Sequence, residues 1–183
     1  MKDFIKSIFA GAMIGIAGSI YLSIDINWVG AIFFSIGLII ICLMEYNLYT
    51  GKVGYIKSYK NIPTMLKYIL GNFIGVFLVS LTLTINSSTL VESKLQIPYW
   101  LLLLKSIGCG FLMFIAVDIY KQKKNIIGII CCIPAFILAG FEHSIADLFY
   151  ICCSGIFNWQ IIIFIIIVII GNAIGALLHK IIQ

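Results

Sequence analysis

Long apolar runs, separated by short polar breaks, are the feature that most constrains the fold of this chain. A helix that crosses a bilayer needs about 20 predominantly apolar residues. The 183 residues are 62% hydrophobic and 10% charged, which leaves too little polar surface to enclose a soluble core. We therefore predict an all-α membrane protein and exclude a soluble catalytic domain and an extended nucleic-acid surface. The six predicted spans are Phe4–Ile24, Trp28–Leu48, Thr64–Ile85, Pro98–Ile119, Ile126–Cys153 and Trp159–Leu178.

The lysines predict the orientation of these spans, because short cytoplasmic loops of membrane proteins are enriched in positive charge. With the N-terminus inside, only Lys94 and Lys105 fall toward the outside. The first run is long enough to be retained as a span rather than removed as a signal. We expect both termini in the cytoplasm. Three tryptophans then lie at outer span ends, where indole rings favour the interface: Trp28, Trp100 and Trp159. The lysines on the inner side are Lys2, Lys6, Lys52, Lys57, Lys60, Lys67, Lys121, Lys123, Lys124 and Lys180.

Two segments of the sequence repeat at a nearly constant offset. Lys6-Ser7-Ile8 in the first span matches Lys105-Ser106-Ile107 in the fourth, 99 residues later. The third and sixth spans share a Gly-Asn-x-x-Gly segment at an offset of 100 residues. Close helix packing alone also produces Gly-x-x-x-Gly patterns, but two agreeing offsets favour a duplication. Each half holds three spans, so the second half must enter from the opposite side, and we predict an inverted repeat. The helix-packing residues are Gly71, Asn72, Gly75, Gly171, Asn172 and Gly175.

The second span of each half is interrupted. In the first half a polar stretch that begins at Glu45 ends at Gly51, which we expect to take a left-handed turn. In the second half, Ile126–Cys153 is too long for one crossing and contains Pro134 and Gly140. Broken backbone at membrane depth is tolerated only where it is buried in protein or lines a cavity. The breaks at Gly51 and Gly140 are therefore candidates for a transport path between the two halves. We expect one transmembrane domain, 1–183, with repeats at about 4–85 and 98–181.

Glu142, His143 and Asp147 form the densest group of ionisable residues inside a span. Such residues are costly in a membrane and are functional candidates for that reason. If the chain is helical from Glu142 onward, His143 and Asp147 share a face, and the carboxylate could hydrogen-bond to the imidazole. Two other interpretations stay open, namely a pair that braces two helices and a metal site, which would need a third ligand. The six cysteines lack Cys-x-x-Cys spacing and are interpreted as packing residues, so we expect from them neither a disulfide framework nor a metal site. We expect no cofactor.

Several segments together resemble the formate/nitrite transporter family. Ala139-Gly140-Phe141-Glu142-His143-Ser144-Ile145-Ala146, followed by Asp147-Leu148-Phe149, is similar to the most specific signature of that family. Leu48-Tyr49-Thr50-Gly51 is similar to the loop after its second helix, and the Gly-Asn-x-x-Gly segments fall in its third and sixth helices. The resemblance covers all six predicted spans.

The resemblance implies an aquaporin-like six-helix protomer in a homopentamer, located in the cytoplasmic membrane of a bacterium. It implies passage of small monovalent weak-acid anions such as formate, nitrite, hydrosulfide, acetate or lactate. Matched position by position, His143 corresponds to the central pore histidine and Thr50 to the threonine that faces it. The vestibule lysine corresponds most closely to Lys94, with Lys105 as the alternative.

The sequence departs from the family pattern near these positions. Gly110 and Asp147 stand where the family usually has asparagine, and Asn47 stands where it usually has glutamate. Lys52 replaces an asparagine after the threonine-glycine pair, and the first span begins without the family's amphipathic N-terminal helix. We therefore expect a rewired polar network around the histidine.

A bare anion loses several kcal/mol of solvation in an apolar constriction, whereas a neutral acid of the same size avoids most of that penalty. We therefore expect a lysine to gather the anion, and His143 with Thr50 to supply hydrogen bonds or a proton to the weak acid. A carboxylate at Asp147 would favour the imidazolium. Two alternatives stay open: the substrate-capture membrane subunit of a multi-component importer, and an intramembrane enzyme that uses Glu142, His143 and Asp147.

Overall fold

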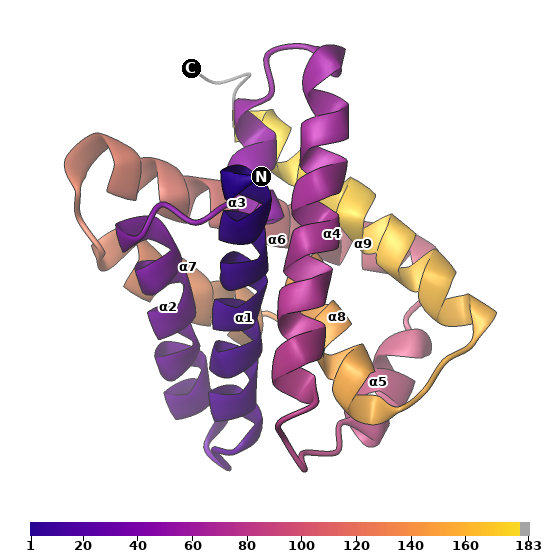
Figure 1. Cartoon of the computed structure of the whole chain (residues 1–183). Helices are drawn as coiled ribbons and strands as arrows, with labels where there is room; N and C mark the ends of the chain where they lie inside the picture. The colour runs from indigo at the N-terminus through magenta and orange to yellow at the C-terminus, as the bar shows by residue number, and fades with distance from the viewer. Residues whose placement is uncertain (180–183) are drawn as a thin grey trace.

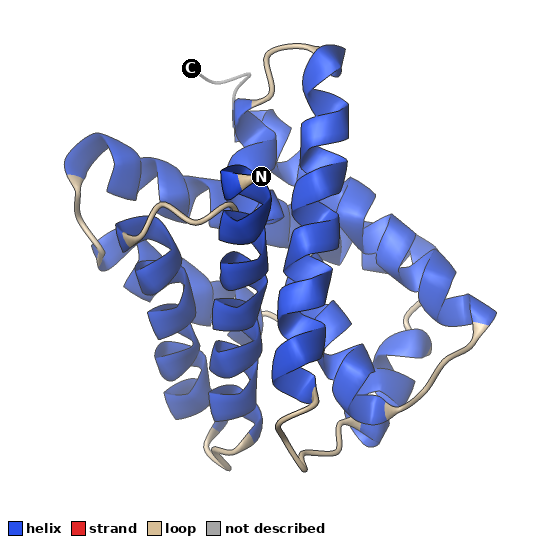
Figure 2. Cartoon of the chain, viewed as in Figure 1, coloured by secondary structure: helices blue, strands red, loops and turns tan. Residues whose placement is uncertain are grey.

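The described residues of the computed structural model, 1–179, form nine α-helices and two 3₁₀ turns, with no strand among them (Figures 1 and 2). Lys180, one of the lysines that predicted the orientation, lies outside these residues. The α-helices are α1 Lys2–Leu22, α2 Asn27–Leu43, α3 Tyr49–Lys52, α4 Ile62–Ser80, α5 Ser88–Leu95, α6 Tyr99–Lys123, α7 Ile127–Leu138, α8 Ser144–Ser154 and α9 Trp159–Leu178; the turns are η1 Val53–Tyr55 and η2 Tyr59–Asn61.

Four helical segments are long and apolar enough to cross a membrane, and they fall in the first, third, fourth and sixth predicted spans: α1, Tyr59–Ser80, α6 and α9. The other apolar helices, α2, α7 and α8, are shorter. The second predicted span is helical only to Leu43, and the third ends at Ser80 instead of Ile85. The fifth predicted span is divided into α7 and α8. Large apolar side chains such as Leu66, Trp100 and Ile162 face outward, as a lipid-facing surface requires.

Both interruptions use the same backbone motif. Glu45 after α2 and Gly140 after α7 take left-handed conformations, with φ of 55° and 66°. The next N–H donates back to the last turn, from Tyr46 to the Ile41 carbonyl at 2.9 Å and from Phe141 to the Phe136 carbonyl at 3.0 Å. This bond across six residues is the Schellman pattern, which ends a helix and satisfies its last carbonyls.

The prediction of a left-handed turn at Gly51 is wrong. The left-handed residue must directly follow the last helical turn, and that position is Glu45. Gly51 lies inside α3, after the break. Its lack of a side chain serves packing, because a Cβ atom there would lie only 3.2 Å from Val117 Cγ2.

The Gly-Asn-x-x-Gly segments bring two helix pairs into backbone contact. Helix α1 packs against α4 and α2, and α6 packs against α9 (Figure 1). A side chain on Gly75 would collide with the Ile8 carbonyl of α1, and one on Gly175 would collide with the Ile107 carbonyl of α6. The same is true of Gly71 beside Ser7. These glycines therefore allow the asparagines between them to reach backbone groups of other elements. Gly171 meets Ser106 in the same way.

Candidate functional site

Thr50 and His143 meet where the two broken spans approach each other. Thr50 lies on α3, and His143 is the N-cap residue of α8. Thr50 Oγ1 is 3.0 Å from His143 Nε2, and the two residues are 0% and 2% exposed. The hydroxyl and the imidazole therefore form a buried polar contact between two segments that are distant in the sequence.

The hydrogen bonds of His143 assign its tautomer. The backbone N–H of Ala146 donates to Nδ1 at 3.1 Å, so Nδ1 carries no proton. A neutral imidazole has one donor and one acceptor nitrogen, so Nε2 carries the proton and donates to Thr50 Oγ1. The Phe136 ring stacks on the imidazole, with 5.8 Å between the ring centroids. The ring is therefore held neutral and fixed in orientation.

Two asparagines hold the broken segments in place. Asn72 Oδ1 accepts from the Tyr49 N–H at 2.9 Å, and Asn172 Oδ1 accepts from the Ser144 N–H at 2.9 Å. Each side-chain amide also donates to the carbonyl of a residue in the break, from Asn72 to Asn47 and from Asn172 to Glu142. Each amide further donates to a carbonyl of a long helix, Ser7 in α1 and Ser106 in α6. Both amides thus satisfy backbone groups that a helix break leaves without partners.

The predicted contact between His143 and Asp147 does not form. As the N-cap residue, His143 lies outside the helical turn that would place it beside Asp147, and its Nδ1 is bound to the Ala146 N–H instead. Asp147 Oδ1 pairs with Lys94 Nζ at 3.0 Å, and the Glu142 carboxylate contacts the same ammonium. Burial disfavours the charged ammonium, but the charges of Asp147 and Glu142 outweigh burial and raise the pKa of Lys94 above its ordinary value.

A cavity of about 370 Å³, which we call the histidine cavity, contains this charged group. Both lysines considered for the vestibule line it. Lys94 reaches the carboxylates from α5, and Lys105 Nζ lies 3.5 Å from the position that a Cβ atom would take at Gly140. The charged and polar residues that line the histidine cavity include Lys94, Lys105, Glu142, His143 and Asp147. The aromatic residues that line it are Tyr21, Phe34, Phe136, Phe141 and Tyr150.

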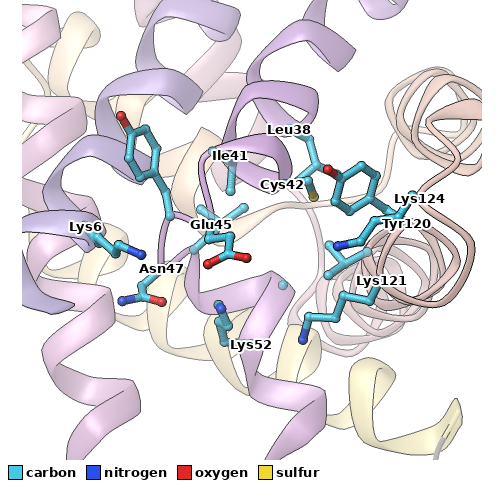
Figure 3. A pocket seen from close by; sticks show the side chains of 14 residues that line it. Lys6, Leu38, Ile41, Cys42, Glu45, Asn47, Lys52, Tyr120, Lys121 and Lys124 are labelled. Carbon is cyan, nitrogen blue, oxygen red and sulfur yellow. The ribbon is translucent and has the colours of Figure 1, made fainter.

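A second cavity of about 330 Å³, the lysine cavity, is lined by Lys6, Lys52, Lys121 and Lys124 around Glu45. In Figure 3 Glu45 lies between Lys6 on one side and Lys121 on the other, with Lys52 nearby. The sequence indicates Lys6, Lys121 and Lys124 only as charges that orient the spans, and Lys52 also as a departure from the family pattern. The separations of these lysines along the sequence do not indicate that α1, α3 and α6 bring them together.

Asn47, which departs from the family pattern, lines the lysine cavity. Its amide donates to the Asp3 carbonyl at 3.1 Å, and its own carbonyl accepts from Asn72. The residue therefore ties the first break to the start of α1. Gly51 also lines this cavity.

Apolar side chains separate the two cavities. On α2, Phe34 lines the histidine cavity and Leu38 lines the lysine cavity, so the change occurs within about one helical turn. Phe34 is 2% exposed and Leu38 is 0% exposed. Thr50 lies at the same division, because its neighbour Gly51 lines one cavity and its partner His143 lines the other. The Thr50–His143 contact thus lies between two cavities with lysine-bearing walls.

Within residues 1–179, no group of three His, Cys, Asp or Glu side chains could hold a metal ion. The second histidine, His179, lies beside the rings of Phe111 and Phe114. It therefore does not complete a ligand set with Glu142, His143 and Asp147 in this part of the chain.

The model of the formate/nitrite transporter family matches residues 1–182. The chain belongs to this family. It is 31% identical over 176 residues to an uncharacterized transporter, YrhG, of Bacillus subtilis (strain 168); the match covers 80% of this chain and 66% of the relative. The chain therefore spans about two thirds of that relative's length.

Two solved structures share the fold. An FNT family ion channel aligns with a TM-score of 0.86 and 21% identity over 96% of this chain and 86% of that chain. A pentameric formate channel with formate bound aligns with a TM-score of 0.85 and 20% identity over 98% of this chain and 93% of that chain. The family and these neighbours are channels and transporters. Together with the apolar helices, the family membership identifies the chain as an integral membrane protein.

Proposed function

We propose that the chain is a channel or transporter for small monovalent weak-acid anions, such as formate, nitrite, hydrosulfide or short carboxylates, which pass as the neutral acid or together with a proton. The observation that carries this proposal is the Thr50–His143 contact, buried between two lysine-lined cavities. The relative with bound formate and the family membership support the same substrate class.

The chemistry of the constriction favours a neutral acid. Phe34, Leu38 and Phe136 surround the division between the cavities with apolar surface. A bare anion there would lose several kcal/mol of solvation without a compensating positive charge. The neutral imidazole and the threonine hydroxyl offer hydrogen bonds that a small acid can use without a full charge. The lysines of the cavities raise the local concentration of the anion before it is protonated.

The proposed path runs from the histidine cavity, past the Thr50–His143 contact, to the lysine cavity. Lys105 gathers anions in the histidine cavity, and Lys94 is held by Glu142 and Asp147. In the second cavity Asn47 positions the first break. The proposed pore residues are His143, Thr50, Glu142, Asp147, Lys94, Lys105 and Asn47.

We propose that the chain is one transmembrane domain of two inverted three-span repeats. The shared Schellman motif at Glu45 and Gly140 supports this architecture, as do the equivalent bonds of Asn72 and Asn172. One pair of equivalent contacts between a glycine and a phenylalanine also supports the repeat. Gly15 of α1 faces Phe149 of α8, and in the other half the two residue types are interchanged, with Phe114 of α6 facing Gly54 of η1.

The distribution of lysines supports the proposed orientation, with both termini in the cytoplasm. Lys6, Lys52, Lys121 and Lys124, all from the predicted inner set, line one cavity. Lys94 and Lys105, the predicted outer pair, line the other. We propose the bacterial cytoplasmic membrane as the location. We also propose a homopentamer, since the related formate channel is pentameric.

A substrate panel in proteoliposomes, with and without a pH gradient, tests the function. We expect uptake of formate, nitrite and hydrosulfide to rise when the side of supply is more acidic. His143→Asn removes the ring that contacts Thr50 and should lower the flux at least tenfold, or about 1.4 kcal/mol in barrier. The same substitution at His179, the other of the two histidines, is the matched control. Equal flux and an equal pH profile in His143→Asn and the unmodified protein would overturn the proposal.

A further inference from the structure

The charged group in the histidine cavity has one ammonium and two carboxylates. Lys94 on α5 contacts Glu142 and Asp147, whose residues are 3% and 1% exposed. One Asp147 oxygen, Oδ1, faces the ammonium at 3.0 Å. The other, Oδ2, is buried and has no hydrogen-bond partner among the described residues. The group therefore contains an unmatched acceptor as well as an excess negative charge.

Both features are costly at this depth. A buried polar atom without a hydrogen-bond partner lowers the stability of the fold by about 1–3 kcal/mol. A buried charge without a counter-charge lowers it further, and such a carboxylate usually binds a proton and becomes neutral. One proton on the carboxyl pair removes the excess charge of the Lys94 group. Because the two carboxylates share one ammonium, the proton belongs to the group as a whole, and Asp147 Oδ2 is its free attachment point.

The same proton changes the charge of the whole cavity. Lys94 and Lys105 balance Glu142 and Asp147 when all four are ionised, so the cavity is then neutral. With one proton bound, the cavity has a single positive charge. His143 does not alter this balance, because its two ring nitrogens are arranged as in the neutral form. The other titratable groups near Asp147 are the Tyr21 phenol of α1, the Tyr150 phenol of α8 and the Cys109 thiol of α6.

We infer that Asp147 is a proton-binding residue whose protonation makes the histidine cavity attractive to anions. The inference rests on the proposed function for the identity of the anion. By linkage, the proton favours binding of the anion, and the anion favours binding of the proton by the same factor. At low pH the cavity is positive and takes up the anion readily. At high pH it is neutral, and uptake from this side weakens. An asparagine at this position cannot bind the proton.

Infrared difference spectroscopy on the purified full-length protein tests the proton site without transport. We expect the carbonyl stretch of a protonated carboxyl at low pH, its loss as the pH rises, and its absence in Asp147→Asn. Asp118→Asn is the matched control. The Asp118 carboxylate lies on α6 and accepts hydrogen bonds from Tyr55 of η1 and Gln122 of α6, so this substitution should leave the band unchanged. No titrating band in the unmodified protein, or the same band in Asp147→Asn, overturns the inference.

The apparent KM for formate in proteoliposomes tests the link between proton and anion. In the unmodified protein KM should rise with pH, with the same midpoint as the infrared band. In Asp147→Asn the cavity stays positive, so KM at high pH should fall about tenfold and should depend little on pH. Different midpoints in the unmodified protein, or an unchanged KM profile in Asp147→Asn, overturn the inference. The midpoint comparison needs no variant, so it decides the question even if Asp147→Asn does not fold.

The two experiments also separate this inference from the proposed function. A titrating Asp147 band in a protein that moves no weak acid would overturn the proposed function and leave the proton site intact. Proton-dependent formate flux in a protein without that band would support the function and overturn the role of Asp147.

Discussion

Thr50 Oγ1 lies 3.0 Å from His143 Nε2, although 93 residues separate the two in the sequence. Thr50 is the second residue of α3, just after the first helix break, and His143 is the last residue of the second break. Asn72 and Asn172 bind the backbone beside them, at Tyr49 and Ser144. These bonds hold the backbone next to both residues, and the His143 ring is further held by the Ala146 N–H, so the hydroxyl and the imidazole face each other.

Thr50→Val should impair both flux and stability. Valine keeps the shape of threonine but removes the acceptor of His143 Nε2–H, which is then buried without a partner. The expected cost is about 1–3 kcal/mol in unfolding free energy, with a fall of about tenfold in formate flux. Thermal unfolding in detergent and proteoliposome uptake measure the two effects. Thr82→Val, at an exposed threonine, is the control. A Thr50→Val protein that matches the control in both assays would contradict the assigned hydrogen bond.

Asn172→Ala should destabilise the second break. Its side chain makes three hydrogen bonds, to Ser144, Glu142 and Ser106, at 2.8–2.9 Å. Removing it leaves these backbone groups buried and unpaired, which should lower the unfolding free energy by about 2–4 kcal/mol. The measurement is thermal unfolding beside Asn86→Ala, a control at an exposed asparagine. Equal midpoints for the two variants would show that the bonds contribute nothing to stability.

Glu45→Gly should stabilise the protein. Glu45 takes a left-handed conformation with φ of 55°, which costs a residue with a side chain about 1 kcal/mol relative to glycine. Glu45→Gln keeps this cost and removes only the charge, so it separates the backbone effect from the effect of the lysines nearby. Thermal unfolding should place Glu45→Gly above both the unmodified protein and Glu45→Gln. The reverse order would mean that the carboxylate stabilises the lysine cavity more than the turn costs.

The two lysines of the histidine cavity should respond differently to substitution. Lys94→Met leaves Glu142 and Asp147 buried without their counter-ion and should lower the unfolding free energy by about 3–5 kcal/mol. Lys105→Met removes a partly exposed charge and should leave stability unchanged while raising KM for formate about threefold at low salt. Unfolding curves and uptake at two salt concentrations test both expectations. If Lys105→Met unfolded as early as Lys94→Met, the division of roles between them would be wrong.

Local patterns in the sequence predicted the membrane class, the family and the segments where helices pack closely. The apolar runs predicted where α1, α6 and α9 lie, since the bilayer thickness sets the length of a crossing helix. The two Gly-Asn-x-x-Gly segments predicted close packing at Asn72 and Asn172, because only glycine permits backbone contact there. The resemblance indicated His143 and Thr50, and the structure brings these two residues into contact.

Other features depended on contacts between segments that are distant in the sequence. The turn at Glu45 replaces the expected turn at Gly51, because α2 ends at Leu43 and the left-handed residue follows its last turn, well before that glycine. Asp147 pairs with Lys94 and not with His143, because α5 brings an ammonium to a carboxylate 53 residues later in the sequence. The lysine cavity forms from α1, α3 and α6 in the same way. The sequence by itself determined which charged side chains the protein has. Because the interaction between two charges depends on their distance in space and not on their separation along the chain, only the tertiary structure decided which of these side chains form pairs.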